Sequence, residues 1–242
     1  MAHFYLSDEA ADATVGSVVA VTGQEARHAV TVGRLAVGER LSVGDGRGLI
    51  VDGLVTLADG DRFELAVEST RFEEPPSPTI WLAQALAKND RDELAIQAAT
   101  ELGVDGVIPW AAGRSIVKWE GAKVRRHEER WASILREASK QSVRHRIPLL
   151  RPLASTATLA KLGEEFQLVV LDPTADLPLS RLPRTGRDIL VIVGPEGGIA
   201  PAELARFAAA GASAVSLGRN VLRTSTAGPA ALAVLGVALG RW

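Results

Sequence analysis

The apolar residues of the first 72 positions occur in short runs separated by glycine and aspartate. Gly44-Asp45-Gly46 and Ala58-Asp59-Gly60-Asp61 are two such separators, and these residue types are typical of tight turns. Short strands at this spacing predict a small β-barrel, interrupted by one short helix from Gln24 to Val32. The predicted strands are 18–21, 40–43, 48–51, 54–57 and 63–67.

A proline-rich segment follows the predicted barrel. Glu73-Glu74-Pro75-Pro76-Ser77-Pro78 places three prolines in four positions, which neither a strand nor a helix can continue. Residues 73–78 are therefore predicted to link a first domain, residues 1–72, to a second domain, residues 79–242.

After Pro78 the pattern changes to apolar runs that alternate with helical periodicity. This alternation predicts an α/β domain with a mainly parallel sheet covered by helices. The last helix is apolar almost all round, so we expect it to be buried, in part against a second subunit. The predicted strands are 79–85, 106–110, 168–172, 188–193 and 214–217, and the main predicted helices are 90–102, 123–142 and 227–239.

Composition narrows the class of protein. The 242 residues are 47% hydrophobic and 23% charged, as in an ordinary globular protein. The absence of cysteine excludes a disulfide framework and a thiolate metal site, and the four histidines lack metal-site spacing. The N-terminus has no signal-peptide pattern, and the most apolar segment, 229–240, is too short to cross a bilayer. We therefore expect a cytoplasmic protein with neither a metal nor a membrane segment.

The charges are unevenly distributed along the chain. The net charge is −2, yet the stretch from Arg114 to Arg146 holds ten lysines and arginines against four glutamates. Such a local excess suits a nucleic-acid phosphate backbone. The alternative is a solvated helix face with pairs four residues apart, and charge alone does not decide between the two.

The segment VGPEGGIAPAELARF, residues 193–207, follows an aliphatic run and has the pattern of a strand, a glycine turn and a helix. Pro201 and Glu203 suit the first turn of a helix. The turn matches neither dinucleotide nor triphosphate motifs, and the carboxylate of Glu196 would repel a phosphate. An uncharged or cationic ligand is predicted here, unless the turn binds nothing.

Two further segments have the same kind of position. The segment LGRNVLRTSTA, residues 217–227, follows a predicted strand and contains Arg223 before three residues able to cap a helix. The segment KNDRDELAIQAATE, residues 88–101, follows the first strand of the domain and is alternatively a solvated helix entrance.

These segments, taken in order, resemble one family. The matching pieces are His28 with residues 30–35, then 87–109, 137–148, 193–204 and 217–227, which together cover nearly the whole chain in register. The sequence resembles the RsmE family of 16S ribosomal RNA uridine-N3 methyltransferases, within the SPOUT superfamily.

The resemblance implies a fold and a cofactor. It implies an N-terminal PUA-like β-barrel domain joined to a trefoil-knotted SPOUT methyltransferase domain of the α/β class, which forms a homodimer. It also implies S-adenosylmethionine as the cofactor, held by three loops that follow three strands. The residues implied at the cofactor are Leu171, Asp172, Pro173, Gly194, Pro195, Glu196, Gly197, Gly198, Leu217, Gly218, Asn220, Val221, Leu222, Thr226 and Ala227.

The implied chemistry makes demands on side chains. Uridine N3 is an imide nitrogen that becomes nucleophilic when its proton leaves, so the resulting anion has to be stabilised. Arg223 is the candidate for binding that anion, and Glu196 and Glu101 are candidates for the base. The family pattern has an arginine at position 220 and a glutamate at position 225, where this chain has Asn220 and Ser225. No role of those two family residues is carried over.

The substrate implied is 16S ribosomal RNA within the small ribosomal subunit. Two alternatives remain: methylation of another ribosomal RNA position, and a non-catalytic RNA-binding assembly factor. The residues expected to bind RNA are Arg27, Arg34, Lys88, Arg91, Arg114, Lys123, Arg125, Arg126, Lys140, Arg144 and Arg146.

Overall fold

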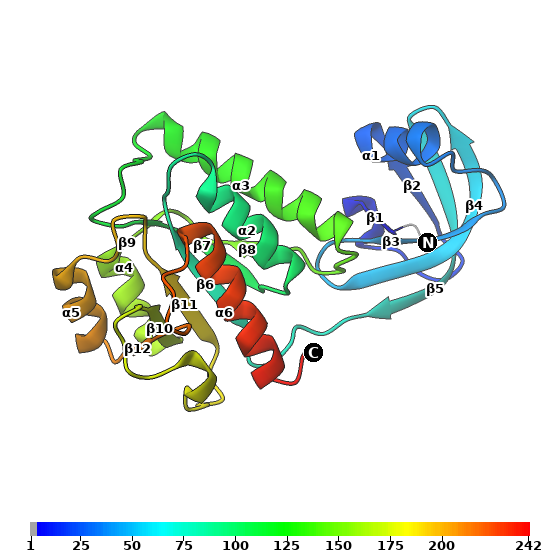
Figure 1. The fold of residues 1–242 in the computed structure, drawn as a ribbon. Helices are drawn as coiled ribbons and strands as arrows, with labels where there is room; N and C mark the ends of the chain where they lie inside the picture. The colour runs from blue at the N-terminus through cyan, green and yellow to red at the C-terminus, as the bar shows by residue number, and fades with distance from the viewer. Residues whose placement is uncertain (1–3) are drawn as a thin grey trace. The chain divides into compact units, whose positions relative to one another are not determined.

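The computed structural model describes residues 4–242, and Figure 1 traces the chain. It divides into two units. The first contains the chain up to Pro75 together with Ser139–Ile147, and the second contains Pro76–Ala138 and Pro148–Trp242. The predicted linker, 73–78, spans this division, but the return of Ser139–Ile147 to the first unit differs from the predicted boundaries.

The first unit is built on a five-stranded sheet with the order β1-β3-β4-β5-β2. Strand β1 runs parallel to β3, and the other pairs are antiparallel. Buried apolar side chains from all five strands and from α1 meet in one core, so the sheet curls around it. The elements are β1 Phe4–Leu6, β2 Val18–Thr22, α1 Gly23–Arg27, a π-helical turn His28–Val32, β3 Arg40–Gly44, β4 Leu49–Asp59 and β5 Arg62–Phe72.

One prediction for this unit was wrong. Segments 48–51 and 54–57 are not two strands, because Asp52-Gly53 continues a single eleven-residue strand, β4. The register against β5 shifts between Asp52 and Gly53, which marks a β-bulge. A Cβ atom on Gly53 would lie 2.2 Å from the carbonyl oxygen of Ala66. Glycine is therefore required here by a close backbone approach and not by a turn.

Replacing Gly53 with alanine should lower the stability of the first unit by about 1–3 kcal/mol, because the partner strand has to shift. Scanning calorimetry would measure the change. Gly236→Ala is the matched control, since a Cβ atom there meets Trp242 at an ordinary 3.5 Å within helix α6, Thr224–Ala238. An equal effect of both substitutions would contradict the role of the bulge.

The returning segment Ser139–Ile147 is fixed to the first unit by polar contacts. The Nζ of Lys140 lies 2.8 Å from the carboxylate of Glu25, and both side chains are largely buried. The backbone N–H of Ile147 donates to the carbonyl of Gly46 at 2.9 Å. Arg146 donates to the carbonyls of Arg47 and Glu73. The chain therefore leaves and re-enters this unit.

The second unit contains a parallel sheet with the order β12-β10-β11-β6-β7-β8, and β9 pairs with β7. All five predicted strands are present, whereas the two-residue strands β8 and β9 were missed because so short a segment has no periodicity. The strands are β6 Ile80–Ala85, β7 Gly106–Ala111, β8 Leu149–Leu150, β9 Ala154–Ser155, β10 Gln167–Leu171, β11 Ile189–Val193 and β12 Ser213–Val215.

Helices cover both faces of this sheet (Figure 1). Trp81 and Ala83 of β6 share a core with Leu159 of α4 and Phe207 of α5. On the opposite face, Leu82 lies under α6, which packs beside α2. The bounds are α2 Arg91–Glu101, α3 Ala122–Gln141, α4 Thr156–Lys161, α5 Pro201–Ala209 and α6 Thr224–Ala238.

The strand order creates a topological switch point between β6 and β11. The chain leaves β6 toward β7 on one side, whereas it leaves β11 toward β12 on the other. The carboxyl ends of such diverging strands form the crevice in which α/β proteins bind ligands. The passage of the chain through a trefoil knot stays a prediction.

Candidate active site

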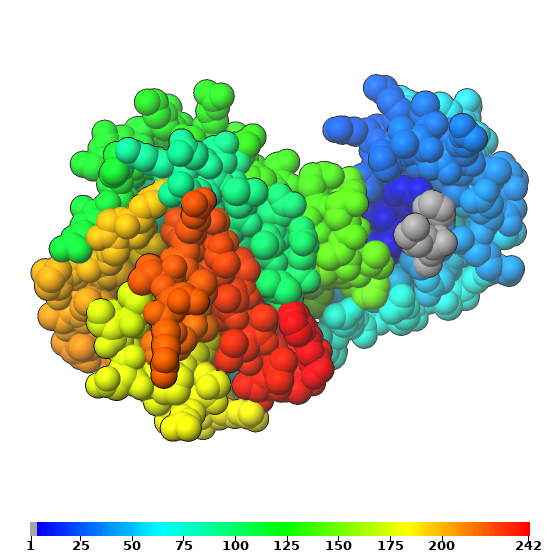
Figure 2. Space-filling view, viewed as in Figure 1, coloured from blue at the N-terminus to red at the C-terminus, as the bar shows by residue number. Residues whose placement is uncertain are grey.

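A cavity of about 540 Å³ lies at the carboxyl ends of three strands. The segments that follow β10, β11 and β12 surround it, and α5 and α6 begin at its edge. In Figure 2 the segment after β12, drawn in orange, stands out on the surface between α6 and the loop after β10. The volume is that of a small-molecule or cofactor site.

Most residues expected at the cofactor line this cavity. Gly197, Gly218 and Thr226 do not, although their neighbours in the chain do. The cavity also includes apolar residues that sequence reasoning missed, such as Val193, Val215 and Leu204. Val193 and Val215 belong to predicted strands, and Leu204 belongs to the predicted helix after the glycine turn. Only the three-dimensional structure shows that these three side chains line the cavity. The expected residues in the lining are Leu171, Asp172, Pro173, Gly194, Pro195, Glu196, Gly198, Leu217, Asn220, Val221, Leu222 and Ala227.

The turn after β11 depends on two glycines, Gly194 and Gly198. A Cβ atom on Gly194 would lie 2.6 Å from the side chain of Ile199, and Gly198 has a φ of +69°. Pro201 is the first residue of α5, as predicted. The turn therefore brings its backbone to the cavity wall before the helix begins.

Glu203 holds this turn in place from below. Its buried carboxylate accepts hydrogen bonds from the N–H of Gly113 at 2.8 Å, the hydroxyl of Thr156 at 2.6 Å and the N–H of Ala200 at 3.1 Å. The three donors come from the loop after β7, from α4 and from the start of α5. Sequence analysis gave Glu203 only a favourable position at a helix N-terminus.

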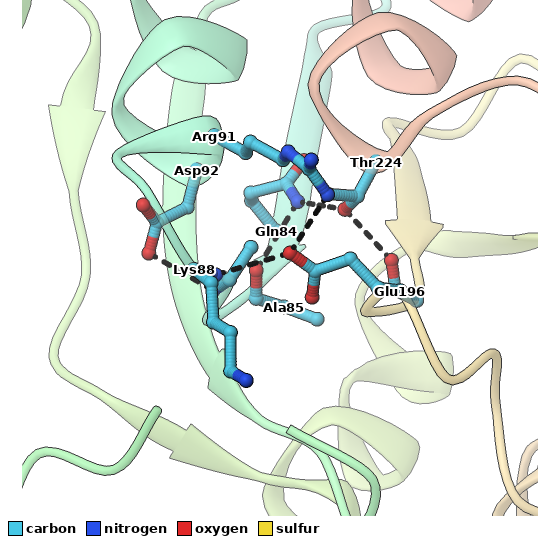
Figure 3. A network of polar contacts seen from close by, with 9 residues as sticks. Gln84, Ala85, Lys88, Arg91, Asp92, Glu196 and Thr224 are labelled. Carbon is cyan, nitrogen blue, oxygen red and sulfur yellow. Dashed lines mark hydrogen bonds and ion pairs between the residues drawn. The ribbon is translucent and has the colours of Figure 1, made fainter. Parts of the chain in front are cut away.

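Glu196 joins the glycine turn to the segment between β6 and α2 (Figure 3). Its Oε1 accepts from the backbone N–H of Lys88 at 3.1 Å and from the guanidinium of Arg91 at 3.3 Å. Arg91 also lines the cavity, whereas the ammonium of Lys88 points away from the network in Figure 3. Two of the residues expected to bind RNA thus contact the cavity-forming turn.

A buried acid lies at the same end of α2. Asp92 accepts from the N–H of Ala87 at 3.2 Å and from the N–H of Glu93 at 2.9 Å. Burial raises the pKa of Asp92 above its ordinary value, and the backbone hydrogen bonds counteract part of that rise. Asp92 therefore supports the β6–α2 turn and does not line the cavity.

Arg223 lies at the cavity edge as the residue that precedes α6. Its backbone is extended, with φ −65° and ψ 152°, and its carbonyl accepts from the N–H groups of Thr226 and Ala227. Within residues 4–242, no hydrogen bond or ion pair of its exposed guanidinium is found. A planar cation is thus presented at the mouth of the cavity.

Glu101 is not part of this site. It is the last residue of α2, is exposed, and accepts a hydrogen bond from Gln97 at 3.3 Å. Arg91, at the other end of α2, lines the cavity. The two residues are ten positions apart, which is about 15 Å along the helix. The resemblance includes Arg91 and Glu101 in one matching segment of the sequence, but helix α2 holds the two residues apart.

The basic residues expected to bind RNA fall into two groups. Lys140 and Arg146 are engaged within the first unit, as described above, and Arg144 is half-buried. The others are exposed or half-exposed, and Arg114 donates to the carbonyl of Gly197 at 3.0 Å, beside the cavity. The exposed members are Arg27, Arg34, Lys88, Arg114, Lys123, Arg125 and Arg126.

Residues 4–242 contain neither a metal-binding cluster nor a membrane-spanning helix. No cluster of three or more histidine, aspartate or glutamate side chains that could hold a metal ion is present there. In the same range, no helix has both the length and the apolar character to cross a membrane.

Comparison with known proteins places this geometry in a family. Residues 73–236 match the model of the RNA methyltransferase domain, and residues 21–68 match that of the RNA methyltransferase PUA domain. The chain is 40% identical to ribosomal RNA small subunit methyltransferase E of Mycobacterium tuberculosis, over 94% of this chain and 89% of the relative. The Bacillus subtilis protein of that name is 30% identical, over 86% and 85%.

A solved structure is similar to this chain over nearly its whole length. Ribosomal RNA small subunit methyltransferase E from Neisseria gonorrhoeae, bound to S-adenosyl methionine, superimposes with a TM-score of 0.88 at 27% identity, covering 98% of each chain. The curled N-terminal sheet is therefore a PUA domain, and the parallel α/β unit is an RNA methyltransferase domain. The chain belongs to the ribosomal RNA small subunit methyltransferase E family.

Proposed function

We propose that this protein transfers a methyl group from S-adenosylmethionine to N3 of a uridine in 16S ribosomal RNA. The observation that carries the proposal is the cavity formed by the loops after β10, β11 and β12, with Arg223 at its mouth. The family relationship supports the same conclusion.

The cavity suits the cofactor in size and chemistry. Its floor is apolar, with Val193, Val215 and Leu204, as an adenine ring requires. Two carboxylates, Asp172 and Glu196, lie in its wall. Glu196 is paired with Arg91, so Asp172 is the carboxylate that favours a cation over a phosphate. When bound, S-adenosylmethionine supplies an electrophilic methyl group on a sulfonium. The residues that would hold it are those of the three loops.

Arg223 would bind the pyrimidine edge of the target uridine. Loss of the N3 proton spreads negative charge over O2, N3 and O4, and a guanidinium offers a planar fork of donors to such an edge. Because the Arg223 guanidinium forms no hydrogen bond or ion pair within residues 4–242, it is available to the substrate. The base has to leave its stack to reach this position.

The two acids expected as bases have other roles in the proposal. Glu196 already accepts hydrogen bonds from the backbone N–H of Lys88 and from the guanidinium of Arg91, so its Oε1 is engaged within the protein. Glu101 lies at the far end of α2. We propose that stabilisation of the uridine anion by Arg223 makes the larger contribution, with the proton passing to water.

The RNA surface of the second unit is proposed around the loop after β7 and the start of α3. Arg114, Lys123, Arg125 and Arg126 are exposed there, and Arg114 contacts the glycine turn of the cavity. On the first unit, Arg27 and Arg34 are exposed candidates. The finished or assembling small subunit is the proposed substrate, in the cytoplasm.

Replacing Arg125 and Arg126 together with alanine should weaken RNA binding and flatten its salt dependence. The slope of log affinity against log salt should fall by about 0.7–0.9 for each lost phosphate contact. Filter binding at several salt concentrations measures the slope, and calorimetry should show unchanged cofactor affinity. Arg181→Ala with Arg184→Ala removes the same charge from another exposed loop and should leave the slope unchanged. Equal slopes for both variants would reject the assignment.

A homodimer is proposed through the face formed by α2 and α6. Figure 1 shows these helices side by side, and they pack together. Leu94 is 55% exposed, Val237 64% and Trp242 62%, so large apolar side chains face solvent on this side. A second copy would cover them.

Methyl transfer to small ribosomal subunits that lack the modification tests the function. Labelled S-adenosylmethionine, digestion and mass analysis of nucleosides identify the product. N3-methyluridine at one site is the expected result, and it would show that Asn220 and Ser225 are tolerated. Another methylated nucleoside would favour a different RNA position. Cofactor binding without transfer would favour the non-catalytic assembly role.

A further inference from the structure

A fully buried amide lies beneath the cavity, in a strand that supplies none of the three cofactor loops. Gln84 has no exposed surface and sits in β6, within the apolar run Ile80–Ala85. Burying an amide in an apolar sheet is unfavourable unless it is hydrogen-bonded. The amide therefore has to be explained by its partners.

The Gln84 amide begins a short chain of hydrogen bonds (Figure 3). Its Nε2 donates to the hydroxyl of Thr224 at 2.8 Å, and that hydroxyl donates its single proton to the carbonyl of Gly194 at 2.8 Å. The donors and acceptors are consistent along the whole chain. It connects the central strand β6 to the first residue of α6 and to the first residue of the glycine turn.

Two of the three residues in this chain belong to the cavity. Thr224 and Gly194 line it, and Arg223 precedes Thr224 directly. Because no hydrogen bond or ion pair of the Arg223 guanidinium is found within residues 4–242, the buried hydroxyl of the neighbouring Thr224 is the side-chain anchor next to its backbone. The position of Arg223 therefore depends on where Thr224 is held.

Close packing keeps α6 within reach of Gln84. A Cβ atom on Gly228, one turn into α6, would lie 3.1 Å from both methyl groups of Leu82 and 3.7 Å from Gln84 Oε1. Glycine thus lets the helix lie directly on β6. Without the Gln84 amide, that packing and the hydrogen bond from Thr224 to Gly194 would set the start of α6.

Gln84 does not optimise stability. Its Oε1 is buried and has no partner within the described residues. A methionine of similar shape would remove that unsatisfied acceptor, and Thr224 would still donate to Gly194. Gln84 Nε2 donates to Thr224 and, at 3.2 Å, to the carbonyl of Ala85, but the buried Oε1 without a partner offsets these two hydrogen bonds. The fold therefore gains little from glutamine at this position, which points to a role in the site.

We propose that Gln84 is a positioning residue for the methyl transfer: through Thr224 it sets the separation between the glycine turn and Arg223. The proposal rests on the proposed function for its catalytic consequence. Its consequence for cofactor binding does not depend on the identity of the RNA product.

The test compares Gln84→Met with the wild-type protein in three measurements. The midpoint of thermal unfolding should not fall. The Kd for S-adenosylmethionine, measured by calorimetry, should rise about tenfold, and kcat should fall about tenfold, which is the equivalent of one lost hydrogen bond. The same substitution at Gln167, at the amino end of β10 and outside the cavity, should change neither Kd nor kcat.

Thr224→Val provides a second variant that breaks the same chain at its next member. If the two residues act as one unit, the fold-changes in Kd and kcat of the double variant should equal those of either single variant. They should not equal the product of the two single changes. If the losses of the two single variants multiply in the double variant, the proposal is overturned. It is also overturned if Gln84→Met lowers the unfolding midpoint while its Kd and kcat, measured at temperatures well below that midpoint, equal those of the wild type. If the wild-type protein produces no N3-methyluridine, the proposed function fails, and the Kd values still decide the role of Gln84.

Discussion

Replacing Arg223 with alanine should lower kcat by about 10²–10³-fold, which is the usual cost of removing one preorganised donor from a developing anion. The affinity for S-adenosylmethionine should change little, because the guanidinium is proposed to contact the uridine and not the cofactor. Rapid-quench methyl transfer to small subunits, together with calorimetry of cofactor binding, separates the two effects.

Two further variants sharpen this experiment. Arg223→Lys keeps the charge but loses the planar fork, so it should recover only part of the activity. Arg219 is an exposed arginine in the same loop, but it does not line the cavity. The variant Arg219→Ala should therefore behave as wild type. Equal losses at positions 219 and 223 would indicate a general contribution of positive charge to RNA binding and would reject the specific role.

Replacing Glu203 with alanine should lower the free energy of unfolding of the methyltransferase domain by about 3–5 kcal/mol, because three donors lose their acceptor and each unsatisfied buried group costs about 1–3 kcal/mol. The substitution leaves the N–H groups of Gly113 and Ala200 and the hydroxyl of Thr156 without their common acceptor. Urea unfolding followed by tryptophan fluorescence would measure the change.

The matched control at this position is Glu203→Gln. A glutamine keeps one acceptor oxygen and places an amide NH₂ group where the second oxygen was, so it should lose less stability than alanine. Cofactor affinity should fall in both variants, because Ala200 precedes the helix that follows the glycine turn. An alanine variant as stable as the wild type would show that water replaces the carboxylate.

The sequence was sufficient to predict the elements that carry the site. The aliphatic run before Gly194, the proline at the first position of α5 and the residues after β12 each have a local signal, and each lies where it was predicted. Local signals were misleading where one pair of residue types suits two different backbone structures. Asp52-Gly53 has the composition of a turn, yet here it forms a bulge within one strand.

The contacts that assemble the site could not be predicted from local patterns. Glu196 and Lys88 are 108 positions apart, and Gln84 and Thr224 are 140 positions apart. Glu203 meets Gly113 across 90 positions. Nothing in the neighbourhood of these residues indicates their partners, because the strand order β11-β6 brings them together. Glu101 is far from the cavity for another reason, because α2 separates it by ten positions from Arg91, which lines the cavity.

The position of β6 also has a consequence for biosynthesis. All six of its residues are buried, and its two neighbours in the sheet are β7 and β11. Translation produces β7 soon after β6, but Ile189, which pairs with Ile80, emerges more than a hundred residues later. Until then the nascent chain carries an apolar strand with one open edge, which is the kind of segment that aggregates or recruits chaperones. Chains terminated before Ile189 should therefore be insoluble, whereas the residues of β11 should restore solubility by closing that edge.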